Sequence, residues 1–285
     1  MGFLRAKSVV GLDIDTAEIR AVELSGSIQS PSLVKYGRFP LPDGAVREGM
    51  IVNQEKVQEA LDRLWYDAGF SSRDVILGVS NQGVLVRFAT FPKVASAKVD
   101  KLIRYQAQEY IPFPLSSVVL DYIIVGETAG NTEQLMEVLL VAGKRDMLDT
   151  FLEVVSEADL KVKDIDVSSL ALQRVLSFAD SKDTAAVINI GDELSSILVV
   201  DKDNPRFART IPAGLKAAEG VFNCSVSEIV PVEPERKPVW AEDAVSVWSL
   251  TLAGEINSSL SYYQNQQNGA SINRVFLSGR GARIN

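Results

Sequence analysis

The sequence is poor in the side chains on which much enzyme chemistry depends. Its 285 residues include one cysteine, Cys224, and no histidine. A single cysteine excludes an intramolecular disulfide and a cysteine-based zinc site. Without histidine, Ser-His-Asp and Cys-His catalysis are excluded, as is every mechanism that uses imidazole as an acid or base. Any chemistry would have to use carboxylates, hydroxyls, backbone amides and a metal ion.

Long apolar runs and an excess of basic residues are also absent. No uncharged apolar stretch reaches the roughly 18 residues that suggest a membrane-spanning helix. Lysine and arginine number 29 against 37 aspartates and glutamates, a formal net charge of −8, whereas a nucleic-acid surface needs concentrated positive charge. The first residues, Met1 to Lys7, lack the order of a signal peptide. We therefore expect a cytoplasmic protein with no transmembrane segment of its own and no nucleic-acid partner.

Apolar residues make up 46% of the chain and charged residues 23%, the ordinary balance of a globular protein. The length suggests about two domains or one large one. Strand and helix patterns alternate, which predicts an α/β architecture. Tight β-hairpins are expected over 8–25 and 185–201. Further strands are expected at 74–80, 84–90, 118–126, 135–143 and 274–277, and helices at 53–69, 97–110, 146–159, 168–178 and 241–267.

The two predicted hairpins echo each other. In each, an apolar strand carries a polar residue near its end, Asp13 or Asn189, and a short turn follows. Such turns can direct backbone N–H groups at one point, so two of them could clamp a polyphosphate, with Asp13 or Asp15 holding Mg²⁺ through water. Glycines within 278–282 are a third candidate for contact with a nucleotide. The alternative is that these are plain structural turns, where Asp, Thr and Gly are common for backbone reasons.

Several features of the second half of the chain are expected to be structural. Trp248 and the pair Tyr262-Tyr263 are predicted to belong to the core-facing side of a helix rather than to a cofactor site. Cys224 is expected to be a small buried residue. The prolines of 231–238 predict a linker.

Several short segments, taken in their order along the chain, carry a resemblance to a known family. They are Val10–Ile14, Ile19–Leu24, Tyr105–Pro114, Val118–Tyr122, Asp164–Val167, Ile190–Ser196 and Leu277–Gly279. With these segments the chain resembles the PilM family, the actin-like cytoplasmic proteins of type IV pilus assembly that are related to the division protein FtsA. The resemblance covers nearly the whole chain, and the stretch Tyr-Ile-Pro-Phe-Pro followed by Val-Val-Leu-Asp-Tyr is its more specific part.

The resemblance implies a two-lobed, actin-like (ribonuclease H-like) fold. Residues 1–82 and 167–183 would form the first lobe, and 83–166 an inserted β-α-β-β-α subdomain of the FtsA/PilM type. Residues 184–285 would form the second lobe, which is expected to be shortened and incomplete at its C-terminus.

The resemblance also implies ATP with Mg²⁺ in the cleft between the lobes. Two hairpin turns would be the phosphate loops, and the glycine-containing segment near the end would be the adenosine loop. Asp13 would be the metal ligand, and no catalytic residue is identified. The nucleotide-binding residues would be Asp13, Asp15, Thr16, Ala17, Arg20, Gly191, Asp192, Glu193, Ser195, Ser196, Gly279, Arg280 and Gly281.

The partner implied by the resemblance is a PilN-like membrane protein, whose short cytoplasmic N-terminal tail would bind as an extended peptide to the first lobe. Through it the chain would be peripheral at the inner membrane, within the assembly platform for a pilus or a related secretion or competence system. Pilus motor ATPases would be further partners.

Three positions depart from the pattern of the family. Asp15 stands where the family has glycine, Asn189 where an aspartate is usual, and Arg280 interrupts a glycine run. We therefore expect at most weak ATP hydrolysis, because no general base is visible. One alternative is the same adaptor with a degenerate, nucleotide-free site. Others are a small-molecule kinase, which needs a carboxylate base and for which Asp13 and Asp15 are the candidates at a suitable strand end, and an FtsA-like division protein, for which no C-terminal amphipathic helix is visible.

Overall fold

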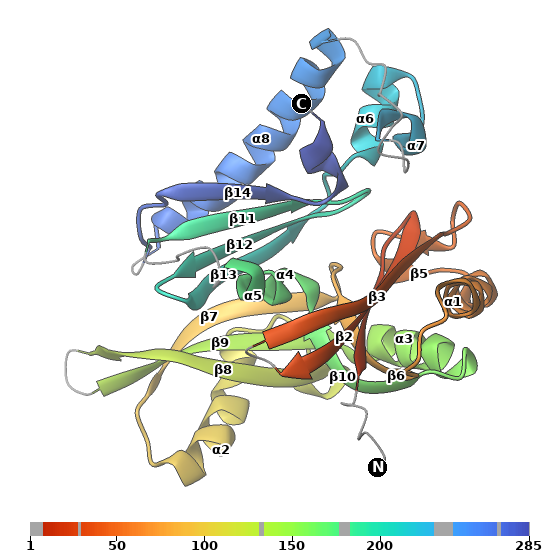
Figure 1. Ribbon diagram of the computed structural model, residues 1–285. Helices are drawn as coiled ribbons and strands as arrows, with labels where there is room; N and C mark the ends of the chain where they lie inside the picture. Colours follow the sequence, from red (N-terminus) through yellow and green to blue (C-terminus); the bar gives the residue numbers. More distant parts are fainter. Residues whose placement is uncertain are drawn as a thin grey trace. The chain divides into compact units, whose positions relative to one another are not determined.

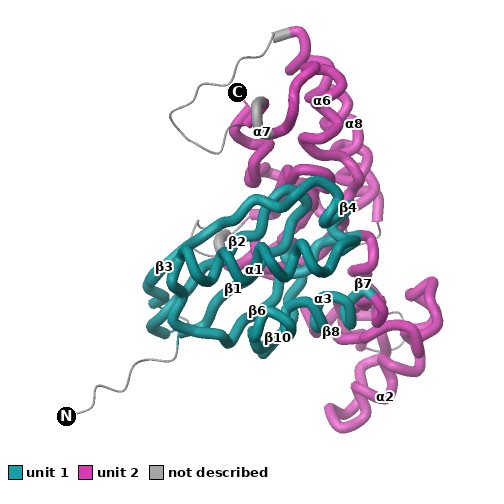
Figure 2. Tube along the Cα trace, turned by 90° about the vertical axis from the view of Figure 1, so that its right-hand side faces the viewer, with its two compact units in different colours: residues 1–81, 147–168 teal, residues 82–146, 169–285 magenta. Residues whose placement is uncertain are grey.

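The computed structural model describes residues 8–27, 30–130, 134–176, 183–230, 242–266 and 269–284. The chain forms two compact units, coloured separately in Figure 2. The first comprises Met1–Asn81 and Met147–Ser168, and the second comprises Gln82–Asp146 and Ser169–Asn285. Each unit is built around its own β-sheets.

The first unit contains a five-stranded sheet in the order β10-β6-β1-β2-β3 (Figure 1). Strands β1, β2 and β3 form an antiparallel meander, and β6 and β10 extend the sheet with parallel pairing. The strands are β1 (Val9–Ile14), β2 (Glu18–Ser27), β3 (Ser30–Pro40), β6 (Asp74–Val79) and β10 (Lys161–Val167), and a small separate ribbon pairs β4 (Val46–Arg47) with β5 (Met50–Ile51).

Two helices, α1 (Gln54–Ala68) and α3 (Arg145–Glu157), lie side by side in the first unit (Figure 2). Gln54 Nε2 donates to a carboxylate oxygen of Glu153 at 3.3 Å, which joins the two helices. The side chain of Asn53 caps the start of α1 by accepting from the backbone N–H of Lys56, and Gly69, with φ of 60°, ends it. Each helix buries a stripe of apolar residues spaced three or four positions apart.

The second unit begins with a three-stranded antiparallel sheet in the order β7-β9-β8. Strand β9 lies in the middle, and most of its residues are buried. Helix α2 packs its buried residues Val99 and Ile103 against this sheet. The elements are β7 (Val84–Pro92), α2 (Ser96–Gln106), the 3-10 turns Ala107–Glu109 and Leu115–Ser117, β8 (Val118–Ala129) and β9 (Gln134–Lys144).

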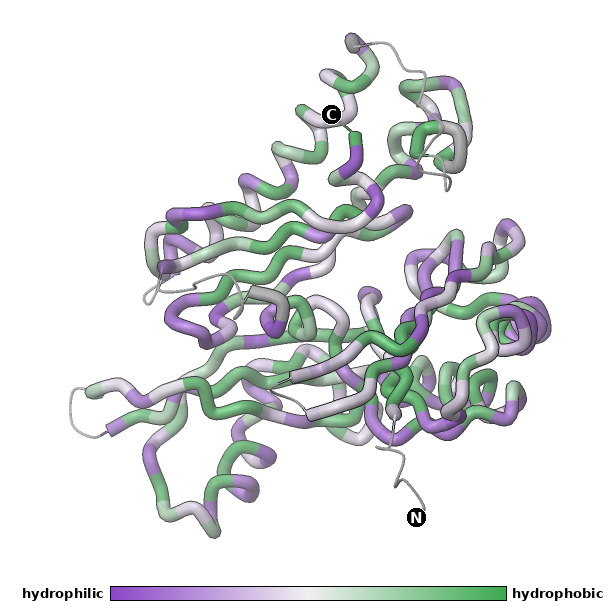
Figure 3. Tube along the Cα trace, in the orientation of Figure 1, coloured by the Kyte–Doolittle hydropathy of each residue, from purple (hydrophilic) through white to green (hydrophobic). Residues whose placement is uncertain are grey.

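A four-stranded sheet in the order β13-β12-β11-β14 forms the rest of the second unit's framework. Strands β11 and β12 are buried along most of their length and hydrophobic in Figure 3. Helix α8 contributes Trp248, Leu252 and Tyr263 to the core beside this sheet. The elements are α4 (Ser168–Ala171), α5 (Gln173–Leu176), β11 (Ala185–Ile190), β12 (Ser195–Asp201), β13 (Asn204–Ile211), α6 (Lys216–Phe222), α7 (Val226–Ile229), α8 (Glu242–Gln264), β14 (Arg274–Ser278) and a 3-10 turn, Arg280–Arg283.

The two larger sheets share one topology. In each, a hairpin continues into an antiparallel third strand, as β1-β2-β3 and as β11-β12-β13. In each, a later strand returns parallel to the first, β6 beside β1 and β14 beside β11. The similarity predicted for the two hairpins therefore extends to the whole sheets, as a fold of two related halves requires.

The structure groups the chain differently from the predicted lobe boundaries. The prediction placed 83–166 in one insert, but β10 pairs with β6 in the first sheet and α3 packs beside α1. Residues 169–176, predicted for the first lobe, fall in the second unit as part of α4 and α5. An apolar stripe specifies that a helix is buried, but it does not specify which sheet covers it.

Other local predictions also differ from the structure. Strands β3, β4, β5, β10 and β13 and helices α6 and α7 were not predicted, and the helix expected over 168–178 is two short helices. Tyr263 is buried, as expected, but its neighbour Tyr262 is 58% exposed. Cys224 is half-buried against the core of the second unit. The linker predicted at 231–238 lies outside the described residues.

Glu23 is a fully buried carboxylate on β2. It accepts hydrogen bonds from Ser8 Oγ at 2.7 Å, from the backbone N–H of Ser71 at 3.1 Å and from Ser71 Oγ. Burial raises the pKa of Glu23, but the hydrogen bonds from Ser71 and Ser8 outweigh burial and leave the pKa below its ordinary value of 4.5. The ionised form is thus favoured by folding.

We predict that Ser71→Ala lowers the free energy of unfolding at neutral pH by about 1.5–3 kcal/mol, because a charged acceptor loses a donor. A lowered folded-state pKa stabilises the fold above the ordinary pKa and loses that contribution as pH falls through the lowered value. The cost of Ser71→Ala should therefore shrink below pH 4.5. Urea unfolding across pH measures this, with Ser71→Ala in a Glu23→Gln background as the control. An equal cost at every pH would contradict it.

Candidate functional site

The turn between β1 and β2 is closed by its own hydrogen bonds. The backbone N–H of Asp15 donates to the carbonyl of Glu18 at 3.1 Å. The backbone N–H of Thr16 donates to the carboxylate of Asp15 at 2.8 Å. The carbonyl of Ala17 accepts from the N–H of Leu41 at 2.8 Å. Two of the turn's amides are thus already engaged within the chain.

Arg20 contacts three carboxylates around this turn. Its Nη2 lies 2.7 Å from Asp13 Oδ2 and 2.8 Å from Asp15 Oδ2, and its Nη1 lies 3.8 Å from Glu18. Asp13 stands directly opposite Arg20 in the β1–β2 ladder, which explains their contact. Asp13 Oδ1 also accepts from Ser168 Oγ at 3.3 Å.

The electrostatics of this cluster favour the charged guanidinium. Burial lowers the pKa of Arg20, but the nearby charges of Asp13, Asp15 and Glu18 outweigh burial and raise it overall. Three carboxylates around one arginine leave the turn with an excess of negative charge. An incoming polyphosphate would meet like charge here.

The turn between β11 and β12 closes in the same way. The N–H of Gly191 donates to the carbonyl of Leu194 at 3.1 Å, as Asp15 does in the first turn. The carbonyls of Gly191 and Asp192 accept from the amides of Leu215 and Lys216, which ties the start of α6 to the turn. The following strand is buried: Ser195 donates its hydroxyl hydrogen to a backbone carbonyl, and Ser196 is 4% exposed.

Arg280 reaches from the chain end to this second turn. Its Nη1 lies 2.9 Å and 3.0 Å from the two carboxylate oxygens of Asp192, whose side chain is 2% exposed. Its Nη2 donates to the carbonyl of Val230 at 3.0 Å. The neighbouring Glu193 pairs with Lys216 at 2.5 Å. Both acids of the second turn therefore have basic partners.

Two glycines let the chain end approach β11 closely. Gly279 has φ of 83°, and a Cβ on it would lie 2.4 Å from the carbonyl oxygen of Ile190. A Cβ on Gly281 would lie 2.1 Å from Ile190 Cγ2. Ser278 and Asn189 are in hydrogen-bond contact at 3.1 Å. Glycine at these positions is required by close packing of the chain on itself.

The candidate residues thus form two clusters, one in each unit. Asp13, Asp15, Thr16, Ala17 and Arg20 meet at the first turn. The candidates from Gly191 to Ser196 and from Gly279 to Gly281 belong to the second unit, where Arg280 joins their two segments. The proposed nucleotide site would need both clusters.

The donor sets of the two turns do not fit Mg²⁺ and a polyphosphate well. In the described ranges, no group of three or more Asp, Glu, Cys or His side chains is placed to hold a metal ion. Asp13, the candidate metal ligand, accepts a hydrogen bond from Arg20 at Oδ2 and one from Ser168 at Oδ1. Mg²⁺ needs free oxygen ligands in a near-octahedral arrangement. Asp13 and Asp15 are also the two candidate bases of a kinase. Both accept hydrogen bonds from Arg20 Nη2.

Two surfaces of the first unit were not found from the sequence. One is an exposed apolar face on β2 and β3, formed by Val22, Leu24, Leu33 and Tyr36, which are 37%, 37%, 67% and 65% exposed. Val22 pairs with Tyr36 and Leu24 with Leu33, so the four side chains share one side of the sheet. The apolar residues of 33–36 are the sequence signal for this face. Because β3 was not predicted, they were not paired with the strand over 18–25.

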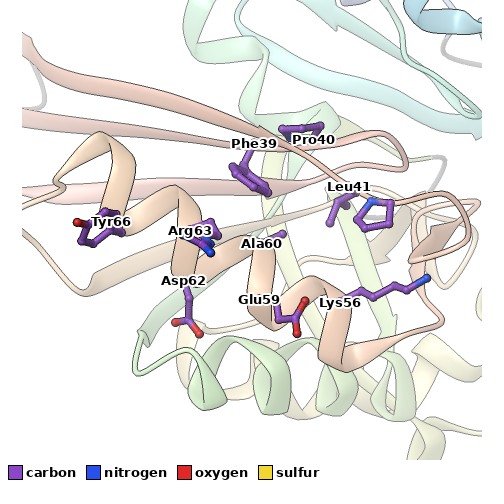
Figure 4. Close-up of a pocket in the computed structure, with 10 residues that line it drawn as sticks. Phe39, Pro40, Leu41, Lys56, Glu59, Ala60, Asp62, Arg63 and Tyr66 are labelled. Atoms are coloured by element: carbon purple, nitrogen blue, oxygen red, sulfur yellow. The ribbon is translucent and has the colours of Figure 1, made fainter.

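The other surface is a groove along α1, with a volume of about 960 Å³. Phe39 to Pro42 line one side of it, and α1 lines the other with both acidic and basic residues (Figure 4). Because both signs of charge line the groove, it does not indicate one class of ligand.

No helix in the described part of the chain is long and apolar enough to cross a membrane. Comparison with solved structures then identifies the fold. The chain is similar to the "PilM-PilN type IV pilus biogenesis complex", with a TM-score of 0.81 and 24% identity over 97% of this chain and 82% of that chain.

Two further solved structures share the fold at lower similarity. The ethanolamine utilization protein EutJ from Carboxydothermus hydrogenoformans has a TM-score of 0.55 and 13% identity, over 99% of this chain and 80% of that chain. A diol dehydratase-reactivating factor in nucleotide-free form has a TM-score of 0.51 and 7% identity, over 98% and 93%. The predicted actin-like fold is confirmed.

Comparison with protein families covers almost the whole sequence. Residues 11–285 match the family described as type IV pilus assembly protein PilM. This match spans both sheets with the duplicated topology and both turn clusters. The chain belongs to the PilM family of type IV pilus assembly proteins.

Proposed function

We propose that the chain is an adaptor of the type IV pilus inner-membrane platform, which binds the cytoplasmic N-terminal peptide of a PilN-like membrane protein. The family supports a role in pilus assembly, and the solved relative is a PilM-PilN complex. In this proposal the chain is cytoplasmic and peripheral at the inner membrane through its partner. Pilus motor ATPases would be further partners of the same platform.

The observation that carries the proposal is the exposed apolar face of β2 and β3. Among the strands that the structure describes, β3 is the edge of its sheet, so one row of its backbone groups has no neighbouring strand there. An extended peptide can add to such an edge, and apolar side chains beside the edge then supply affinity. Leu33 and Tyr36, each about two thirds exposed, would be the main contacts.

The test is binding of a fluorescent peptide that covers the cytoplasmic tail of the PilN-like protein from the same organism. We predict that Leu33→Asp and Tyr36→Asp each weaken binding at least about tenfold, because a charge on the contact face costs about 1.4 kcal/mol or more. Fluorescence anisotropy measures the Kd.

Tyr66→Asp provides the matched control, because Tyr66 is 82% exposed in the same unit but on α1. It should bind the peptide as the wild type does. If all three variants bind equally well, the peptide does not use the β2–β3 face and the proposal is wrong.

The proposal has two forms, one with ATP and Mg²⁺ between the lobes and one without nucleotide. The contacts of Arg20 with Asp13 and Asp15 support the form without nucleotide, because both carboxylates already have a partner. Neither carboxylate is then disposed to activate water, which supports at most weak hydrolysis. The nucleotide-free form is the one that these contacts favour.

A further inference from the structure

The carboxylate of Asp15 accepts hydrogen bonds from the groups of the first turn that could otherwise bind an external anion. It accepts from the N–H of Thr16 at 2.8 Å and from Arg20 Nη2 at 2.8 Å. A backbone amide of a turn and a neighbouring guanidinium are the donors that bind phosphate in proteins. Asp15 is 21% exposed at its side chain, so the turn holds a partly buried anion of its own.

The second turn has glycine at the place that Asp15 holds in the first. Asp15 and Gly191 occupy equivalent places, because each is the first residue after its strand and each donates its N–H across the turn, at 3.1 Å in both cases. Asp13 and Asn189 are likewise equivalent, one residue before the strand end. Glycine at the place of Asp15 is thus compatible with this turn geometry.

The second turn is closed by a different ion pair. Arg280 binds both oxygens of the buried Asp192 and the carbonyl of Val230. A bidentate arginine–carboxylate pair fixes geometry as well as charge. The turn, the chain end and the end of α7 are therefore held together by groups of the chain itself.

We infer that Asp15 is a built-in substitute for a bound phosphate, and that Arg20 and Arg280 set the two turns without nucleotide. The inference deepens the proposed function, because it assigns the adaptor a nucleotide-independent form. Under this inference, the poor fit of the turn residues to Mg·ATP is a feature of this chain and belongs to its nucleotide-independent form.

The experiment compares pyrophosphate binding by the wild type and by Asp15→Gly, with thermal unfolding and calorimetric titration as readouts. The wild type should show neither heat of binding nor a rise in Tm with pyrophosphate or Mg·ATP. Asp15→Gly should bind pyrophosphate at least about tenfold more tightly, the scale of one charge-assisted hydrogen bond, because Arg20 Nη2 and the Thr16 amide lose Asp15 as an acceptor and the turn loses one negative charge.

The matched control is Asp43→Gly, which removes one exposed carboxylate from the same unit and changes the net charge equally. It should bind pyrophosphate no better than the wild type. Asp15→Asn is a second variant, which removes the charge but keeps the side-chain size, and it decides the matter if Asp15→Gly unfolds.

Two outcomes would overturn the inference. One is saturable Mg·ATP binding by the wild type that raises its Tm. The other is a folded Asp15→Gly and Asp15→Asn pair that gains no affinity for pyrophosphate. Peptide binding to β2 and β3 is measured separately in nucleotide-free protein, so either proposal can fail while the other holds.

Discussion

Arg206→Met is expected to lower the free energy of unfolding by about 3–5 kcal/mol, since it removes one partner of a buried ion pair. Arg206 Nη1 lies 2.6 Å from Glu137 Oε2, and the two side chains are 18% and 9% exposed. The guanidinium also lies 5.7 Å from the ring centroid of Phe88. Strand β8 makes room for the carboxylate at Gly126, where a Cβ would lie 2.6 Å from Glu137 Oε2. Urea denaturation followed by circular dichroism measures the loss.

The matched control is Lys93→Met, because the acidic partner of Lys93, like that of Arg206, lies on the three-stranded sheet. Lys93 pairs with Glu127, but these side chains are 41% and 54% exposed. Exposed pairs contribute about 0–1 kcal/mol, so this variant should be nearly neutral. The double variant Arg206→Met/Glu137→Met should recover much of the loss, because no charge stays buried. Equal effects of Arg206→Met and Lys93→Met would show that burial does not set the value of the pair.

Phe151→Ala is expected to cost about 3–5 kcal/mol, the usual cost of emptying a buried aromatic site. Phe151 is 2% exposed on α3, the helix that Gln54 joins to α1. Because α3 belongs to the first unit, the loss should lie there. Hydrogen exchange should therefore rise in β1, β6 and β10 and stay unchanged in β7, β8 and β9.

Leu152→Ala is the control, since Leu152 is the next residue on the same helix but is 36% exposed. A partly exposed surface position should cost about 0.5 kcal/mol or less. If Phe151→Ala instead raised exchange in the three-stranded sheet alone, α3 would belong with the predicted insert of 83–166. The pair of variants thus tests the division of the chain as well as the stability of α3.

Much of the fold follows from local patterns in the sequence. The hairpins β1–β2 and β11–β12, the stop of α1 at Gly69 and the stripe of α8 were all predicted. Period-two and period-3.6 patterns record which residues face a core, and turn and cap residues record where an element ends. Strand β3 was missed because most of its residues are exposed, so its pattern does not alternate.

For the candidate site, too, the sequence predicted local features but not the contacts between side chains. The sequence identified both turns and their equivalence, because residues within a turn are close along the chain. It did not predict that Arg20 binds Asp15, although the two are five residues apart. It named Arg280 only as an interruption of a glycine run, whereas the structure pairs it with Asp192, 88 residues away.

By itself, then, the sequence determined the α/β class, the duplicated hairpins, the excluded chemistries and the resemblance to the PilM family. Only the tertiary structure decided that β10 completes the first sheet and that α3 belongs to the same unit. It also decided that Arg206 and Glu137, 69 residues apart, form a buried pair, and that the acids of both turns have partners. The physical reason is range: local geometry follows from neighbouring residues, but the charge and hydrogen-bond partners of a side chain depend on which distant segments fold beside it.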